Sequence, residues 1–460
     1  MWSRRFVSLL LVCLVGYAFL GRGFAYIGIP PLFIDTLIFG LALWVLVLNP
    51  GWIRMLRLPQ IWLLGLYMVW GAICTIPYIE RYGFDALRDG VLWAWGLIGI
   101  AVGYVVSSRD LFYGVTTWYS KWIRRFVYWT PLAYTFYRLW TDLVPRLPWG
   151  PGAGVPVYNP KGGDIAVHLV GILSFVVVVV PYLGYRQGRA TYRAGWLFWL
   201  SWLIAFALIG FTGRGAFLTV ILSLAFLSIH LRVRRSATAA ILVASFIAFF
   251  ALTGLEIDLG HWRKVSFEQL RVNVQSIIGE VEGYSGEGSK RWRLMWWTEI
   301  LNYTFFGDYF WTGKGFGINL ANDDGFQVYA DSSLRSPHNG HLTILARSGV
   351  PGFTLWVLFQ SAFSLSLWWR YFKLRRGERR FEAALCLWVM VYWMGAMINA
   401  TFDVYLEGPQ GGLWYWTIVG LGLGLLYKDR MMQSARISHP QLLPAARGGG
   451  RSLRLGDGAA

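Results

Sequence analysis

The sequence predicts an all-α protein, a polytopic bundle of membrane helices. Of its 460 residues, 56% are hydrophobic and only 14% are charged, whereas soluble globular proteins are about 25% charged. The hydrophobic residues form about twelve long apolar runs, and the basic residues gather in short clusters between them. Short basic loops mark the cytoplasmic side of membrane proteins. The net charge of +18 therefore indicates membrane topology and not nucleic-acid binding.

Each expected membrane helix is an apolar run near the length of about 20 residues that crosses a bilayer. The first run, 6–20, follows a short basic start and is expected to remain as a helix, because no small-residue cleavage site follows it. The further expected spans are 32–48, 60–77, 91–106, 126–141, 165–184, 195–210, 214–231, 238–254, 342–369, 382–402 and 411–427. Residues 1–435 would form one transmembrane domain, and the Gly- and Arg-rich residues 436–460 a disordered cytoplasmic tail.

The positions of Lys and Arg predict the orientation of these helices. Alternate loops are rich in basic residues, namely those at 54–57, 109–125, 186–193, 232–235 and 370–380. Short loops of this kind stay in the cytoplasm. Both termini are therefore expected inside, and the long polar interval at about 255–341 outside.

Two segments of the external interval are expected to be short amphipathic helices. In the first, Leu270, Val274 and Ile277 recur at helical spacing among polar residues. A flexible, glycine-containing joint is expected at 283–289. The second segment, 290–301, combines three Trp with three basic residues. This composition suits a helix at the membrane interface, beside anionic headgroups.

The sequence Pro337-His338-Asn339 closes the external interval just before an apolar span. The proline stops an extended segment, so the histidine is placed where a membrane helix begins. Histidine has an unperturbed pKa near neutrality, so His338 could accept a proton from a hydroxyl. Asn339 is then available to bind a substrate or to cap the helix. The alternative is an ordinary capping turn in which His338 faces the lipid headgroups.

Two arginines are expected on the same external face as this histidine. Arg214 follows a turn of only three residues, 211–213, between two apolar runs, so it is fixed at the outer end of a helix. Arg293 lies in the second amphipathic segment. Guanidinium groups bind phosphate oxygens bidentately and keep their charge. Together with His338, the two arginines suit a diphosphate leaving group and an acceptor hydroxyl.

Four motifs in this order resemble the bacterial O-antigen ligase and O-antigen polymerase superfamily, which are membrane glycosyltransferases that use lipid-linked glycans. The motifs are Thr212 to Ala216, Arg291 to Trp296, Gly313 to Gly317, and Pro337-His338-Asn339 running into Gly349 to Gly352. The resemblance implies a GT-C-like fold, an undecaprenyl-diphosphate-linked glycan donor, and an inverting transfer without a metal or another cofactor. The donor-binding arginines of the family correspond to Arg214 and to Arg293, with Arg291 as the alternative. Its histidine corresponds to His338.

Three other residues bear on this interpretation. Many family members carry an acidic residue in the helix after the histidine. This chain has Arg347 at that position, so any structural role of that acidic residue is in doubt here. His168, near the outer end of its span, could line the donor path or be an ordinary buried histidine. The spacing His338-x-x-His341 resembles part of a zinc site, but no carboxylate or third histidine lies nearby in the sequence. His341 is therefore expected to pack in the first turn of its helix.

The resemblance leaves the reaction partly open. The long external interval late in the chain favours a ligase that joins a polysaccharide to a glycan or lipid-core acceptor. Polymerisation of repeat units and transfer to a protein are alternatives. The expected location is the bacterial inner membrane, with the active site on the periplasmic face. A transporter or lipid flippase would need ionisable pairs at mid-membrane and broken helices in matching halves, and the spans contain few ionisable residues.

Overall fold

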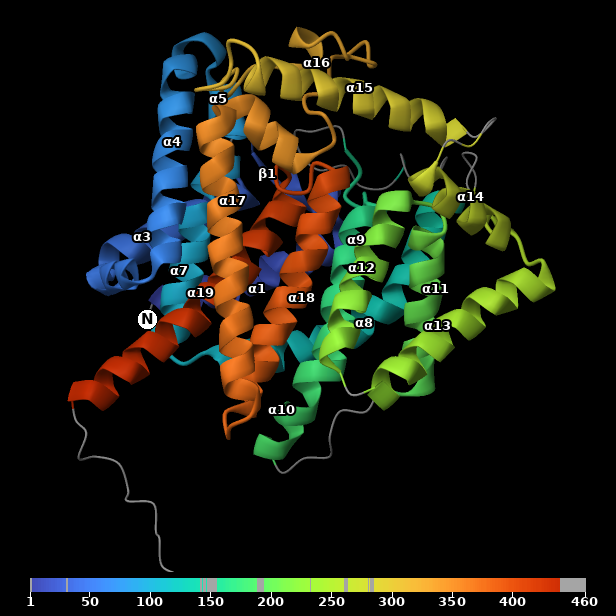
Figure 1. Ribbon diagram of the computed structural model, residues 1–460, viewed down its shortest axis with the longest axis horizontal. Coiled ribbons are helices and arrows are strands. Elements are labelled where there is room, and N and C mark those ends of the chain that lie inside the picture. The colour runs from blue at the N-terminus through green and yellow to red at the C-terminus, as the bar shows by residue number, and fades with distance from the viewer. Residues whose placement is uncertain are drawn as a thin grey trace, which may run out of the picture.

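The protein is a bundle of helices that stand side by side, with further helices lying across one end (Figure 1). The computed structural model describes residues 2–29, 32–140, 143, 146, 155–187, 194–231, 233–259, 264–279, 281 and 285–438. The helices are α1 (Trp2–Leu20), α2 (Arg22–Ala25), α3 (Ile34–Leu48), the 3-10 helix η1 (Pro50–Arg57), α4 (Pro59–Tyr82), α5 (Phe84–Asp89), α6 (Val91–Ala94), α7 (Gly96–Ser108), α8 (Phe112–Leu139), α9 (Gly162–Ser174), the π-helix η3 (Phe175–Val179), α10 (Val180–Gln187), α11 (Trp196–Gly210), α12 (Arg214–His230), α13 (Val233–Thr253), α14 (Phe267–Ile278), α15 (Ser285–Phe305), α16 (Leu320–Asp323), α17 (Gly340–Arg375), α18 (Arg380–Phe402) and α19 (Pro409–Ser438). Two short antiparallel pairs join β1 (Gly28–Ile29) to β2 (Leu32–Phe33) and β3 (Ile257–Asp258) to β4 (Lys264–Val265).

The all-α membrane bundle expected from the sequence is confirmed. A helix lies in each range expected to span the membrane. The described residues contain six helical stretches that are long and apolar enough to cross a membrane, or seven if α3 and η1, bent by 87°, count as one. The six stretches are Trp2–Leu20, Pro59–Tyr82, Phe84–Ser108, Gly162–Leu183, Gly340–Arg375 and Arg380–Phe402. Twelve crossings remain a prediction, because several helices in the other expected ranges, such as Trp196–Gly210 and Arg214–His230, are shorter than these six.

Several sequence expectations fall partly outside the described residues, among them the basic loop at 232–235, of which residue 232 is not described. The basic loop at 186–193 is described only to residue 187, and the expected tail at 436–460 only to Ser438, where α19 ends. The expected joint at 283–289 is described from Ser285, where α15 begins. Residues 285–289 are therefore helical, and the prediction of a flexible joint was wrong for them.

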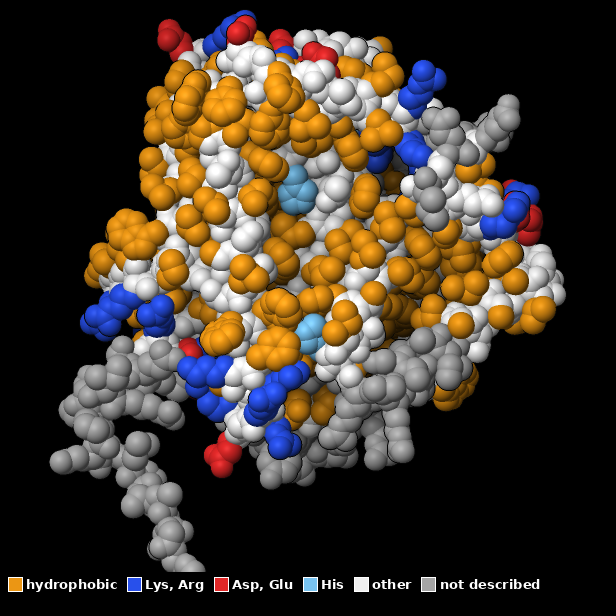
Figure 2. Space-filling view, in the orientation of Figure 1, with side chains coloured by type: hydrophobic (Ala, Val, Ile, Leu, Met, Phe, Trp, Pro, Cys, Tyr) orange, Lys and Arg blue, Asp and Glu red, His pale blue; other side chains and the backbone are white. Residues whose placement is uncertain are grey.

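The surface of the bundle is apolar in its middle. Hydrophobic side chains cover the centre of the face shown in Figure 2, whereas charged side chains gather toward its two ends. Leu132, Ile229 and Leu252 are 73%, 79% and 86% exposed. Soluble monomers rarely expose large contiguous apolar patches, and a lipid bilayer would cover such a band at no cost.

Inside the bundle, α7 and α19 pack closely through paired glycines. A methyl group added at Gly420 would lie 2.7 Å from the carbonyl oxygen of Gly99, and one at Gly424 would lie 2.8 Å from that of Gly103. Both helices thus present a glycine every fourth residue at the contact, which lets two helix backbones approach each other in a membrane.

A second, smaller core holds α15 and α16 to the start of α17. Its buried members are Trp296, Ile300, Leu320, Ala321, Leu334, Leu345 and Ala346. The ring of Trp296 stacks on Phe326 with centroids 5.4 Å apart, and its Nε1 donates to Asp324 at 2.6 Å. Trp296 was expected at the lipid interface with the other tryptophans of its segment. It is fully buried instead, because the loop after α15 folds back over it.

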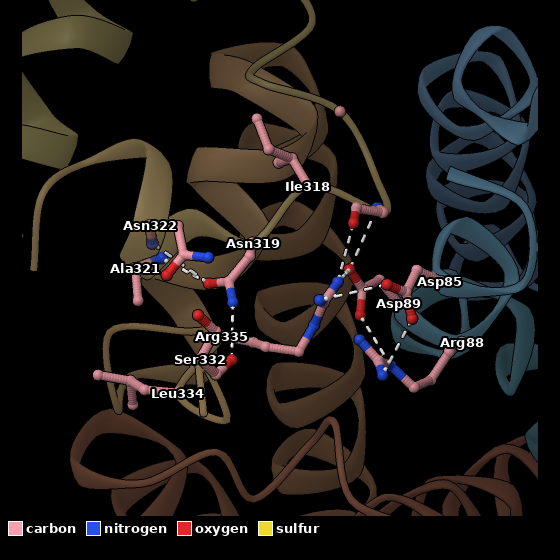
Figure 3. A network of polar contacts seen from close by, with 12 residues as sticks. Asp85, Arg88, Asp89, Ile318, Asn319, Ala321, Asn322, Ser332, Leu334 and Arg335 are labelled. Atoms are coloured by element: carbon pink, nitrogen blue, oxygen red, sulfur yellow. Dashed lines mark hydrogen bonds and ion pairs between the residues drawn. The ribbon is translucent and has the colours of Figure 1, made fainter. Parts of the chain in front are cut away.

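Arg347 anchors the loop that follows α15 to the bundle. Its side chain, 1% exposed, lies 2.9 Å from Asp89 at the end of α5 and donates to the carbonyl oxygens of Gly315 and Ile318. Arg335 also pairs with Asp89, at 3.0 Å (Figure 3). Arg347 thus has a structural role of its own at this position, as the most buried base of the ion-pair network around Asp89, and it helps to hold the glycine-rich turn at 313–317.

Replacing Arg347 with alanine is expected to destabilise the protein by about 3 kcal/mol, because it removes the most buried partner of Asp89 and leaves the carbonyl oxygens of Gly315 and Ile318 without their donor. Thermal unfolding of the purified protein in detergent measures this. Arg88→Ala is the matched control, since Arg88 also pairs with Asp89 but its side chain is 44% exposed, and exposed pairs contribute about 1 kcal/mol or less. Equal unfolding temperatures for the two variants would contradict the role of Arg347.

Candidate functional site

A cavity of about 760 Å³ lies at the end of the bundle that α14 and α15 cover. Its walls come from the end of α8, the start of α9, the turn between α11 and α12, α14, α15, and the end of α18. Arg214, Arg293 and His338 all line it. Three residues that are far apart in the sequence therefore share one cavity, as the expected topology requires. The other predicted site residues, Arg291, Asn339 and His168, do not line it.

Arg214 is the first residue of α12, directly after the turn at 211–213. Its Nη1 donates to Ser276 Oγ of α14 at 3.2 Å, and Asn273 of α14 donates to the carbonyl oxygen of Phe211. The amphipathic helix α14 is thereby fixed over the turn. The first turn of a helix also has unpaired backbone N–H groups and a partial positive charge. The guanidinium and the helix terminus together favour an anion in the cavity.

Arg293 reaches the cavity from α15, and Arg291 does not. Arg293 Nη1 donates to the carbonyl oxygen of Phe402 at 3.1 Å, at the end of α18. Residues two apart on a helix are rotated by about 200°, so Arg291 lies on the other side of α15 and is exposed. Of the two arginines that the sequence left as alternatives, Arg293 lines the cavity and Arg291 does not.

His338 projects from a turn whose geometry is set by its neighbours. Its φ of 52° lies in the left-handed region, which non-glycine residues seldom adopt. On one side, the carbonyl oxygen of Pro337 accepts a hydrogen bond from Trp297 Nε1 at 2.9 Å. On the other, Asn339 Oδ1 accepts from the backbone N–H groups of His341 and Leu342, both at 3.1 Å. Asn339 is thus the N-cap of α17. It is 5% exposed, and its cap fixes the backbone directly after His338.

His338 has a charged neighbour, Asp403, that was not predicted from the sequence. Asp403, the residue after α18, lies with Oδ1 3.6 Å from His338 Nδ1 and 3.2 Å from Lys161 Nζ. Burial alone would raise the pKa of the Asp403 carboxyl, but the Lys161 ammonium and the nearby His338 ring outweigh burial and lower this pKa below its usual range. Asp403 therefore stays ionised at neutral pH. A carboxylate beside Nδ1 favours a proton on that nitrogen and leaves Nε2 as the proton acceptor.

The cavity is strongly cationic. Its described lining contains five basic side chains and a single carboxylate, that of Asp403; the basic residues are Arg138, Lys161, Arg214, Lys290 and Arg293. Among the described residues, the buried Nη2 of Arg138 has no hydrogen-bond partner. Arg138 could have been noticed in the sequence, because it is one of the few charged residues in an expected span. Such a lining is suited to a ligand with several negative charges.

The two other candidate histidines lie outside the cavity. His168 is 2% exposed in the core, where its Nδ1 is 2.8 Å from the hydroxyl of Tyr392. His341 uses both ring nitrogens within the protein, because Nε2 donates to the carbonyl oxygen of Met397 and Nδ1 accepts from Trp356 Nε1. The packing expected for His341 is confirmed, and neither nitrogen is available to a metal shared with His338.

Residues 199–357 match a family described as O-antigen ligase. The match supports the resemblance to the O-antigen ligase and polymerase superfamily that the sequence motifs indicate. The matched segment, about a third of the chain, contains Arg214, Arg293 and His338. Arg138, Lys161 and Asp403 lie outside the matched segment. No curated protein matches the chain.

Proposed function

We propose that this protein transfers a glycan from an undecaprenyl-diphosphate-linked donor to an acceptor hydroxyl, as a polysaccharide ligase. The observation that carries the proposal is the cavity in which five basic side chains surround His338. A diphosphate is a small, highly charged group that needs several cations, and a polyprenyl chain would extend from it into the membrane. The proposal includes a GT-C-like bundle of twelve spans in the inner membrane, with this cavity on the periplasmic face.

In the proposed reaction, Arg214 and Arg293 bind the diphosphate. Each guanidinium forms two parallel hydrogen bonds to phosphate oxygens. Negative charge develops on the diphosphate as its bond to the anomeric carbon breaks, and fixed cations stabilise that charge. The diphosphate is already a good leaving group, so no acid is needed to protonate it.

The acceptor hydroxyl is the weaker partner in the reaction, and His338 is proposed as its base. Nε2 removes the hydroxyl proton as the oxygen attacks the anomeric carbon from the face opposite the diphosphate. One glycosidic bond forms, the bond to phosphate breaks, and the configuration inverts. Asp403 stabilises the resulting imidazolium, because its carboxylate lies beside Nδ1.

The proposed mechanism uses charged side chains where other enzymes use a metal-activated hydroxyl. Glycan transfer by the purified protein is therefore expected to be unchanged after treatment with EDTA. Turnover measured before and after chelation checks this, with readdition of Mg²⁺ or Zn²⁺ as the control. Loss of activity that either ion restores would contradict the metal-independent step.

A ligase and a polymerase differ in the acceptor. Purified protein, given one lipid-linked glycan donor, should be offered a lipid-core acceptor in one reaction and a second lipid-linked repeat unit in another. The ligase proposal predicts that the glycan appears on the lipid core. Extension of the lipid-linked repeat unit alone would make the protein a polymerase, and no product with either acceptor would contradict both.

The location of the cavity is tested by topology reporters. A reporter fused after residue 286, beside the cavity, is expected to act outside, and one fused after residue 376, beyond α17, is expected to act inside. The fusions are assayed with an enzyme that is active only in the periplasm and with one active only in the cytoplasm. Both reporters on one side would contradict the shared external face of Arg214, Arg293 and His338.

A further inference from the structure

A second cavity, of about 900 Å³, lies at the opposite end of α17. It is bounded by the last turns of α17, the start of α4 and the second half of α19. α17 has a kink at Gly349, whose φ of 65° is not helical. From this kink, Arg370 is roughly 30 Å away along the helix, which is about the thickness of a bilayer hydrocarbon core. The two cavities therefore lie at opposite ends of the bundle, and no residue lines both.

The second cavity has one apolar wall and one basic wall. Leu365 and Trp369, which line it, are 58% and 76% exposed, so this wall continues onto the lipid-facing surface. The basic wall consists of Arg370, Lys373 and Arg430, against the carboxylate of Asp429. Lys373 and Arg430 are exposed. The cavity is thus open to the membrane on one side and carries a net positive charge.

Two buried polar atoms in this cavity lack partners among the described residues. Gln60 is 3% exposed, and its amide nitrogen donates to Ser366 Oγ and to the carbonyl oxygen of Ala362. Its Oε1 has no donor. Arg370 is also 3% exposed and pairs with Asp429 and Glu382, but its Nε has no acceptor. Buried polar groups are seldom left unpaired. In this cavity, Gln60 Oε1 lacks a donor and Arg370 Nε lacks an acceptor.

We propose that this cavity binds an anionic phospholipid whose headgroup has hydroxyl donors, with phosphatidylglycerol as the fitting example. The phosphate lies between Lys373 and Arg430 and accepts from Arg370 Nε. A headgroup hydroxyl donates to Gln60 Oε1. The acyl chains follow Leu365 and Trp369 into the membrane. A phosphatidylcholine headgroup has no donor and places a cation against the basic wall, and phosphatidylethanolamine also brings a cation there.

Native mass spectrometry of the full-length protein in detergent tests this proposal. Delipidated protein is titrated with phosphatidylglycerol, phosphatidylethanolamine and phosphatidylcholine of identical acyl chains. We expect preferential retention of phosphatidylglycerol. In a Lys373→Gln, Arg430→Gln double variant, this preference should fall about tenfold, because basic residues at the membrane surface attract anionic lipids. Both residues are exposed, so the variant should fold.

The matched control is an Arg375→Gln, Arg376→Gln double variant. It removes the same charge from the same end of the protein, but neither residue lines the cavity. Its preference for phosphatidylglycerol should stay within about twofold of that of the unmodified protein. An equal loss in both double variants would mean attraction by overall charge and would overturn the proposal. Equal retention of the three lipids would overturn it as well.

A competition with glycerol 1-phosphate separates a lipid site from a site for a soluble phosphate compound. Phosphatidylglycerol should remain bound in excess glycerol 1-phosphate, because the apolar wall also binds its chains. Displacement at equal concentration would show that the chains contribute nothing and would overturn the lipid assignment.

Discussion

Replacing His338 with alanine is expected to slow glycan transfer strongly and to leave donor binding intact. A base that removes a proton in the transition state contributes about 10²- to 10⁴-fold in rate, whereas the donor is held by the arginines. Turnover and binding of lipid-linked donor should be measured on the same purified protein. A fall in turnover of about this size, with an unchanged dissociation constant, is the expected result.

His230→Ala is the control for this variant. His230 is the last residue of α12, at the end away from the first cavity, where its ring packs on Tyr371. Its loss should leave turnover unchanged. Near-normal transfer by the His338→Ala protein would refute the assignment of the base, and loss of donor binding together with transfer would reassign His338 to the donor site.

Changing both Arg214 and Arg293 to lysine is expected to weaken donor binding and transfer together. Lysine keeps the charge but loses the planar fork that binds a phosphate through two hydrogen bonds. Charge-assisted hydrogen bonds contribute about 1.5–3 kcal/mol each, so each change should cost roughly tenfold to a hundredfold in kcat/KM. Steady-state kinetics on folded protein measures this loss.

Arg291→Lys provides a matched control in the same helix. Arg291 is two residues from Arg293, on the other side of α15, and is exposed. Its change should have little effect on kcat/KM. A loss at Arg291 equal to that at Arg293 would contradict the orientation of α15, and normal kinetics in the Arg214→Lys, Arg293→Lys double variant would refute the diphosphate clamp.

The helices and the main site residues were predictable because each leaves a local signal. An apolar run must form a helix in a bilayer, since every backbone polar group needs an internal partner there. Basic loops fix the side on which each helix ends. Those two rules predicted one external face for Arg214, Arg293 and His338, and in the structure the three residues line one cavity.

The remaining parts of the site depend on tertiary packing, which leaves no such signal. Asp403 meets Lys161 and His338 only because the end of α18 lies against the start of α9. Whether Arg291 or Arg293 faces the cavity depends on the rotation of α15 about its axis. The burial of Trp296 depends on the loop that folds back over it. In each case the residue type was visible in the sequence and its partner was not.

A structure of the protein with undecaprenyl diphosphate bound tests the central claim most directly. We expect the two phosphates in the cavity beneath α15, with oxygens about 2.7–2.9 Å from the guanidinium nitrogens of Arg214 and Arg293. The position of the transferred glycan would then lie within reach of His338. A diphosphate bound elsewhere on the protein, with neither arginine in contact, would contradict the account.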